Sequence, residues 1–120
     1  MSIPTDVASL QIMAQVFKKE NTQSIFDKTV ESLVAEVPYI DWVGIYLLEE
    51  SDSKLVAASD FDKDLQWECN GELKFPITNS VDEQIGLMVV RSKQPIAFDV
   101  TDVSTLETIS KAIGEQSFAN

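Results

Sequence analysis

The sequence predicts an α+β fold, in which helices pack around a mostly antiparallel sheet. Two observations support this class. Apolar residues recur at helical spacing in the first third of the chain, and short apolar runs separated by polar turns follow them. The chain has 120 residues, of which 44% are hydrophobic, so it can bury one core but hardly two. We therefore treat residues 1–120 as a single domain.

Two helices are predicted at the N-terminal end. Residues 1–20 form the first, whose apolar stripe either packs in the core or pairs with a second copy in a dimer. The second is placed at about Ser24–Glu36, and Pro38 ends it because the residue before a proline resists helical angles. The stripe of the first helix is Val7, Leu10, Met13, Ala14 and Phe17, and the candidate caps of the second are Asn21, Thr22 and Ser24.

Three short strand-like runs follow, with polar residues between them. The turn "EESDSK" joins the first two runs, which predicts an antiparallel hairpin. The segment "DFDKD" resembles the start of a calcium loop, but Leu65 and Gly71 stand where a glycine and a glutamate are required. We therefore expect a solvated acidic loop there. The runs are Trp42–Leu48, Leu55–Ser59 and Glu72–Ile77.

The last third of the chain predicts a helix, a strand and a second helix. The short helix is expected over Asp82–Ser92 and the fourth strand over Pro95–Val100. The final helix is expected to begin at Ser104, where Glu107 completes a capping box, and to end before Gly114.

Composition narrows the function. The net charge of −11 argues against nucleic acid and against anionic membrane surfaces as partners. No apolar run is long enough to span a membrane and no signal peptide is visible, so a cytoplasmic protein is expected. The chain has no histidine, which removes the commonest base and metal ligand, and we expect no metal or cofactor. The one arginine, Arg91, is expected to interact with the dipole of the predicted helix.

The run "DWVGIYLLEE" places a glycine between two aromatic residues. Because side chains alternate along a strand, Trp42, Gly44 and Tyr46 share one face, while the Val, Ile and Leu residues between them form the core face. A small ligand lying on the sheet between the rings would explain the glycine, and so would a bulky side chain from the overlying loop that fills the gap. Trp67, on the loop expected above this face, is either a lid or an aromatic packed on the hairpin.

Three stretches resemble the GAF domain family, namely "IDWVGIYLL", "ELKFPI" and "IGLMVVRSKQPIAFDV". The first strand is also similar to that of the free methionine-(R)-sulfoxide reductases, the closest subgroup. The resemblance covers about residues 22–118. It implies helices on one face of the sheet and a ligand pocket under loops and short helices on the other. It also implies either a minimal version of the domain or one truncated after the fourth strand.

The reductases in that subgroup use cysteines on the loops over the sheet. Aligned on Gly86, one of these positions falls on Ile85, another falls near Glu72, and no cysteine follows Asp99. One thiol attacks the sulfoxide and a second resolves the product, so Cys69 alone cannot complete a self-contained turnover. The resemblance therefore implies a catalytically inactive relative. A residual reductase that uses Cys69 and an external thiol is an alternative.

The resemblance also implies a site and partners. We expect a sensor that binds a small polar molecule or anion, forms a homodimer and passes its bound state to a signalling-protein partner. Asp99 is expected to face the charged group of the ligand. A nitrate or other small-anion sensor, using Trp42, Pro95 and Ile96, and a structural dimerisation module are the alternatives. The implied ligand-binding residues are Trp42, Gly44, Tyr46, Trp67, Pro95, Ile96 and Asp99.

Overall fold

The computed structural model describes residues 3–18, 21–49, 52–95 and 97–117. Within these ranges two helices are followed by four strands and a third helix. No helix among them is long and apolar enough to cross a membrane. The bounds are α1 Ile3–Phe17, α2 Thr22–Glu36, β1 Trp42–Glu49, β2 Asp52–Ala58, β3 Gly71–Thr78, β4 Gln84–Ser92 and α3 Val100–Ser117.

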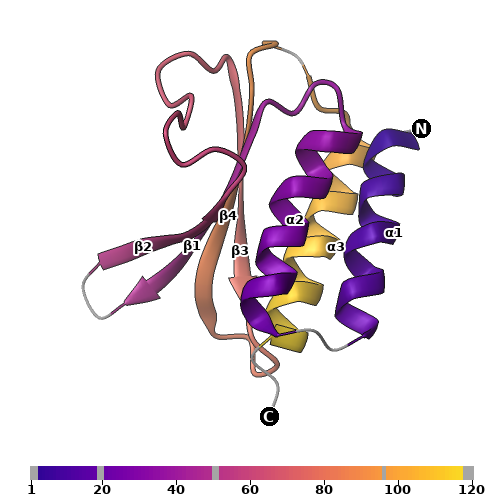
Figure 1. Cartoon of the computed structure of the whole chain (residues 1–120), viewed down its shortest axis with the longest axis vertical. Helices are drawn as coiled ribbons and strands as arrows, with labels where there is room; N and C mark the ends of the chain where they lie inside the picture. The colour runs from indigo at the N-terminus through magenta and orange to yellow at the C-terminus, as the bar shows by residue number, and fades with distance from the viewer. Residues whose placement is uncertain (1–2, 19–20, 50–51, 96, 118–120) are drawn as a thin grey trace.

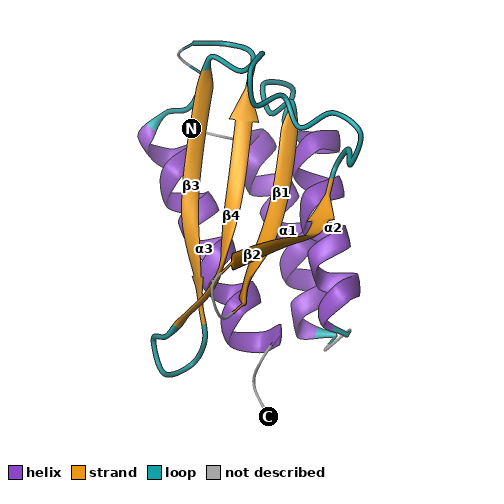
Figure 2. Ribbon diagram, turned by 90° about the vertical axis from the view of Figure 1, so that its left-hand side faces the viewer, coloured by secondary structure: helices purple, strands orange, loops and turns teal. Residues whose placement is uncertain are grey.

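The helices form a layer on one face of the sheet. In this layer α1 contacts α2 and α3, while α3 lies against β3 and α2 lies against β1 and β2. Figure 1 shows the layer on one side of the strands and the loop between β2 and β3 away from it. Figure 2 views the open face of the sheet, with the helices behind. The predicted α+β architecture is confirmed.

The sheet has the strand order β2-β1-β4-β3, and neighbouring strands are antiparallel. The predicted hairpin of β1 and β2 is therefore confirmed. Trp42 of β1 lies opposite Arg91 of β4, and Arg91 lies opposite Glu72 of β3. Cross-strand partners share a face of the sheet, so these three side chains form one row.

The main core lies between the sheet and the helices. Val43 and Ile45 of β1 are fully buried there against Phe26 and Leu33 of α2. This confirms that the Val, Ile and Leu face of β1 is the core face. Burial of a large aliphatic side chain contributes about 1.5–3 kcal/mol, so this layer stabilises the fold.

A buried carboxylate joins elements that are distant in sequence. Asp102 of α3 accepts hydrogen bonds from the Thr5 hydroxyl of α1 and, at 2.7 Å, from the Tyr39 hydroxyl that follows α2. Its other oxygen accepts the Asp99 backbone N–H at 3.1 Å. A buried charge is tolerated when hydrogen bonds surround it, so this residue fixes the N-terminal end of α3 against the other helices.

The predicted helix over Asp82–Ser92 is wrong, because Gln84–Ser92 forms the central strand β4. Helices cover one face of this strand and the β2–β3 loop reaches over the other, so both faces are largely buried. Its apolar residues then run almost continuously instead of alternating. Such a run cannot be told from a short buried helix by periodicity alone.

The predicted strand Pro95–Val100 and the predicted helix start at Ser104 are also wrong. Val100 already begins α3, and Pro95 lies in the loop before it. The capping box is five residues earlier than expected. The Asp99 carboxylate accepts the Asp102 N–H at 2.8 Å, and the Asp102 carboxylate accepts the Asp99 N–H.

Gly114 lies inside α3 rather than after its end. A Cβ on this residue would overlap the carbonyl oxygen of Thr78 and lie 2.9 Å from Cγ2 of Ile77. The glycine therefore permits close packing of the helix on β3, which explains why it is not the C-terminal cap.

Candidate ligand-binding site

The face of the sheet opposite the helices carries the aromatic residues of β1. The expected gap over Gly44 is filled by the indole of Trp42 itself. A Cβ on Gly44 would lie 2.8 Å from the Trp42 ring atoms Cζ2 and Cζ3 and nearer still to Cη2. The glycine therefore accommodates a side chain of the protein, but that side chain belongs to β1 itself and not to the overlying loop, so neither of the two expected explanations holds as stated.

Trp42 is fully buried, and its ring makes a hydrogen bond and a cation–π contact. Its Nε1–H donates to the backbone carbonyl of Asp60 at 2.8 Å, and the Arg91 guanidinium carbon lies 4.7 Å from the centre of its ring. A guanidinium over a desolvated indole gains about 2 kcal/mol from the cation–π interaction. The indole N–H is thus engaged by the protein and does not point to a ligand.

Arg91 and Leu65 attach the loop of residues 59–70 to the sheet. Nη1 of Arg91 donates to the Asp64 carbonyl at 2.7 Å. Leu65 follows with a φ of 58°, in the left-handed region, and its side chain is buried against Trp42 and Val89. This conformation costs a non-glycine residue about 1–2 kcal/mol, which the burial of the side chain offsets.

Glu72 is the ion-pair partner of Arg91. Its Oε2 accepts from Nε of Arg91 at 2.7 Å, and its Oε1 lies 3.7 Å from the Lys74 ammonium. The hydrogen bond from Arg91 lowers the pKa of Glu72, with the charges of Arg91 and Lys74 acting in the same direction and partial burial opposing them. Glu72 therefore stays ionised and fixes the guanidinium.

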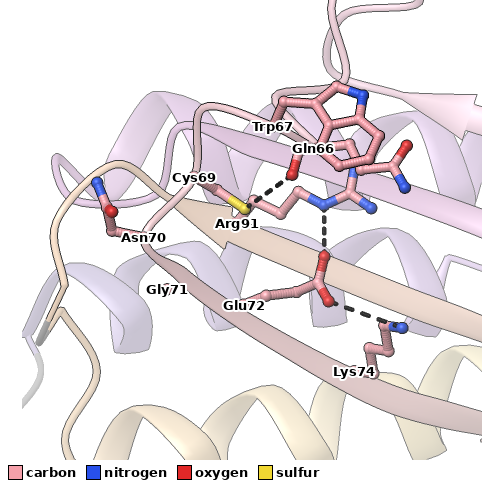
Figure 3. A pocket seen from close by; sticks show the side chains of 8 residues that line it. All are labelled: Gln66, Trp67, Cys69, Asn70, Gly71, Glu72, Lys74 and Arg91. Carbon is pink, nitrogen blue, oxygen red and sulfur yellow. Dashed lines mark hydrogen bonds and ion pairs between the residues drawn. The ribbon is translucent and has the colours of Figure 1, made fainter.

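An open hollow of about 360 Å³ lies beside this row of charges. Figure 3 shows Trp67 and Gln66 on one side of the Arg91 guanidinium and Glu72 and Lys74 on the other. Arg91 is only 6% exposed, whereas Trp67 is 88% exposed. The residues that line the hollow are Gln66, Trp67, Cys69, Asn70, Gly71, Glu72, Lys74 and Arg91.

No protein-family model and no curated protein sequence matches this chain. Solved structures do match it. The match to the structure of fRMsr of Staphylococcus aureus in complex with substrate covers 94% of this chain and 95% of that chain. Its TM-score is 0.78 and the sequence identity is 20%. The match to the GAF domain of an Acinetobacter phosphoenolpyruvate-protein phosphotransferase covers 95% of this chain and 92% of that chain, with a TM-score of 0.74 and 18% identity.

A type II free methionine-R-sulfoxide reductase from Thermoplasma acidophilum is also similar, with 20% identity, a TM-score of 0.68, and coverage of 78% of this chain and 89% of that one. Each of these likenesses extends over most of both molecules. The chain has the GAF fold.

Within the GAF fold of this chain, the residues expected at the ligand site lie in two places. Trp42, Gly44 and Tyr46 lie on the open face, where Tyr46 is half-buried beside the Trp42 cluster. Asp99 lies at the start of α3, where its carboxylate accepts from the Asp102 N–H and the Thr101 hydroxyl. Ile96 is outside the described residues. Ligand binding by these side chains stays a prediction.

The expected role of Arg91 at a helix dipole is wrong, because this residue lies in strand β4 and lines the hollow. The helix predicted for this segment obscured that Leu87, Val89 and Arg91 are two residues apart. In strand β4 this spacing places all three on the open face, beside β1 and β3. A lone arginine in an otherwise apolar run was the available signal, because a buried strand rarely carries a charge without a partner.

The polar groups that line the hollow beside Arg91 include side chains of both charges. The described residues contain no group of three or more His, Cys, Asp and Glu side chains that could bind a metal ion. The hollow offers the guanidinium of Arg91, the ammonium of Lys74 and the indole of Trp67, beside the Glu72 carboxylate that pairs with both cations. It also holds one thiol, that of Cys69, whose Sγ lies 3.7 Å from the Gln66 carbonyl. This set suits an anionic group on a small polar molecule.

Proposed function

We propose that the chain is a small-molecule-binding regulatory domain, and that the anionic group of its ligand binds at Arg91. The observation that carries this proposal is a nearly buried guanidinium in the wall of an open hollow. Nε and Nη1 of Arg91 donate to Glu72 and Asp64. A guanidinium has five N–H donors and these two bonds use two of them, so further donors remain for an oxyanion.

The size and charge of the hollow set the class of ligand. Its volume of about 360 Å³ is at the lower end for small-molecule sites, which fits a molecule about the size of an amino acid or a smaller anion. Arg91 and Lys74 bring two positive charges against one from Glu72, so one negative charge on the ligand balances the site. The exposed indole of Trp67 supplies a flat wall with a hydrogen-bond donor at its edge.

Binding at Arg91 is expected to change the loop of residues 59–70. Arg91 holds this loop through the Asp64 carbonyl, so a ligand that competes for the guanidinium weakens the attachment. The loop would then shift between two positions and pass the bound state to a partner. The size of this response is limited by the difference in ligand affinity between the two positions.

The proposed domain is catalytically inactive, with a single-thiol reductase as the second candidate. The location of Cys69 in the same hollow as Arg91 favours this second candidate. In that reaction the Cys69 thiolate takes the sulfoxide oxygen, giving methionine and a sulfenic acid. Two external thiols then restore Cys69 and leave as a disulfide, with release of water. The assay is turnover of methionine sulfoxide with excess dithiothreitol.

The experiment is a thermal-shift and tryptophan-fluorescence titration with nitrate, nitrite, free amino acids and methionine sulfoxide. A ligand at about one hundred times its Kd raises the free energy of unfolding by about 2.7 kcal/mol. We expect this shift to weaken at least tenfold in Arg91→Lys, which keeps the charge but not the planar fork. Because Arg91 also supports the fold, Trp67→Ala serves as the second variant, since its exposed ring adds little to stability.

Three outcomes would contradict the proposed function. The first is that no member of the panel shifts the melting temperature. The second is that the shift is unchanged in both Arg91→Lys and Trp67→Ala. The third is turnover that is abolished by Cys69→Ser, which would establish the reductase instead. Retention of ligand binding in Cys69→Ser, without turnover in either protein, supports the regulatory domain.

A further inference from the structure

Two large aromatic side chains lie exposed on the loop of residues 59–70. Phe61 is 66% exposed and Trp67 is 88% exposed. Single exposed apolar residues are common on soluble proteins. These two, however, line one hollow of about 290 Å³, and Arg91 is not among its lining residues. A shared aromatic hollow is typical of an interaction surface.

Hydrogen bonds and a buried side chain hold the loop in place, so the positions of Phe61 and Trp67 on the surface are fixed. The Asp60 carboxylate accepts the backbone N–H groups of Asp62 and Lys63, at 2.8 and 3.2 Å. Leu65 is the side chain of the loop that points into the protein, as its burial shows. A loop fixed in this way loses little conformational entropy when a partner binds.

The charge around this hollow is strongly negative. Asp62, Asp64 and Glu68 line it, and Lys63 is the only cation among its lining residues. None of these carboxylates forms an ion pair within the described part of the chain. Carboxylates beside exposed aromatic rings attract lysine and arginine by ion pairing and by the cation–π interaction.

We propose that this hollow is a docking site for a basic segment of a partner protein. The aliphatic stems of its lysine or arginine side chains would pack on Phe61 and Trp67, while their charged ends meet the carboxylates of the loop. A second copy of this chain fits poorly, because each copy carries a net charge of −11. The inference does not rest on the proposed ligand at Arg91.

The test uses an acetylated, amidated decapeptide of alternating lysine and alanine, with a glutamate–alanine decapeptide as the reference. Binding is followed by isothermal titration and by Trp67 fluorescence at about 0.15 M salt. We expect the lysine peptide to bind and the glutamate peptide not to bind. Phe61→Ser should weaken binding at least fivefold, whereas Val81→Ser should not, although Val81 is equally exposed at 68%.

A second pair of variants separates a specific site from general attraction to an acidic protein. The triple variant Asp62→Asn, Asp64→Asn, Glu68→Gln is compared with Glu31→Gln, Glu49→Gln, Glu83→Gln, which removes the same charge from other surfaces. We expect only the first to weaken binding tenfold or more. Equal weakening by both, an unchanged affinity in Phe61→Ser, or no binding of the lysine peptide would each overturn the proposal. Phe61 does not line the Arg91 hollow, so Phe61→Ser should leave any ligand-induced thermal shift intact.

Discussion

Replacing Gly44 with alanine tests whether the Trp42 ring fills the space that the sequence left open. The added methyl group would overlap the far edge of the indole, which is fully buried and hydrogen-bonded to Asp60. Overpacking of this kind costs about 1–3 kcal/mol. A ring that moves away to relieve it also loses its hydrogen bond, worth about 1 kcal/mol.

We therefore expect Gly44→Ala to lower the free energy of unfolding by about 2–4 kcal/mol. For a domain of this size the melting temperature falls by about 10 °C. The assay is urea unfolding followed by far-ultraviolet circular dichroism, with near-ultraviolet signals reporting the indole. If the space over Gly44 were open, the same substitution would cost almost nothing.

A double-mutant cycle assigns the cost to the ring. In Trp42→Leu the side chain ends short of the ring edge that meets Gly44, so the second change Gly44→Ala should cost less than about 0.5 kcal/mol. The coupling energy between the two positions is then most of the effect. An equal cost of Gly44→Ala in both backgrounds would show that the strand backbone, rather than the indole, rejects the methyl group.

Three further predictions concern charges and close packing. The pKa of Glu72 is lowered in the folded protein, so its stabilising effect is complete above the unfolded pKa of about 4.3 and is lost as the pH falls through the folded pKa. Glu72→Gln should therefore reduce the fall in the free energy of unfolding between pH 7 and pH 3. An unchanged pH dependence would contradict the ion pair. Asp99→Ala should cost about 0.5–2 kcal/mol by removing the cap of α3, and Asp99→Ser should restore most of it; equal losses in urea unfolding would argue against capping. Gly114→Ala should destabilise by about 1–3 kcal/mol, although alanine favours helices, because its Cβ meets the Thr78 carbonyl; a gain in melting temperature would refute this packing.

The parts of the fold that the sequence predicted are those with one solvent face. The amphipathic α2, the hairpin of β1 and β2, and β3 show clear periodicity, and Asn21 caps α2 as one of the expected candidates. The prediction for the region from β4 to α3 was wrong because tertiary contacts changed the pattern there. Burial on both faces removed the alternation of β4, and the true cap at Asp99 was obscured by a second matching pattern at Ser104.

The candidate site was less predictable than the fold, because it depends on which strands are neighbours. The sequence identified Trp42, Gly44 and Trp67 as residues of one region, and the loop does lie over that face. It could not show that the Trp42 ring would fold back over Gly44. Nor could it pair Arg91 with Glu72, since that contact exists only once β3 and β4 are aligned.

Arg91 also explains why the strand register is fixed. A shift of β4 by one residue would turn every side chain to the opposite face and place the guanidinium among the aliphatic residues under the helices. There it would lose Glu72, the Asp64 carbonyl and the Trp42 ring together, and an uncompensated buried charge costs several kcal/mol. The same contacts therefore define the register of the sheet, attach the loop over the open face and hold the Arg91 guanidinium beside the hollow. Under the proposed function, a ligand bound at Arg91 would compete with the contacts to Glu72, Asp64 and Trp42 together, and binding would change the position of the loop through this residue.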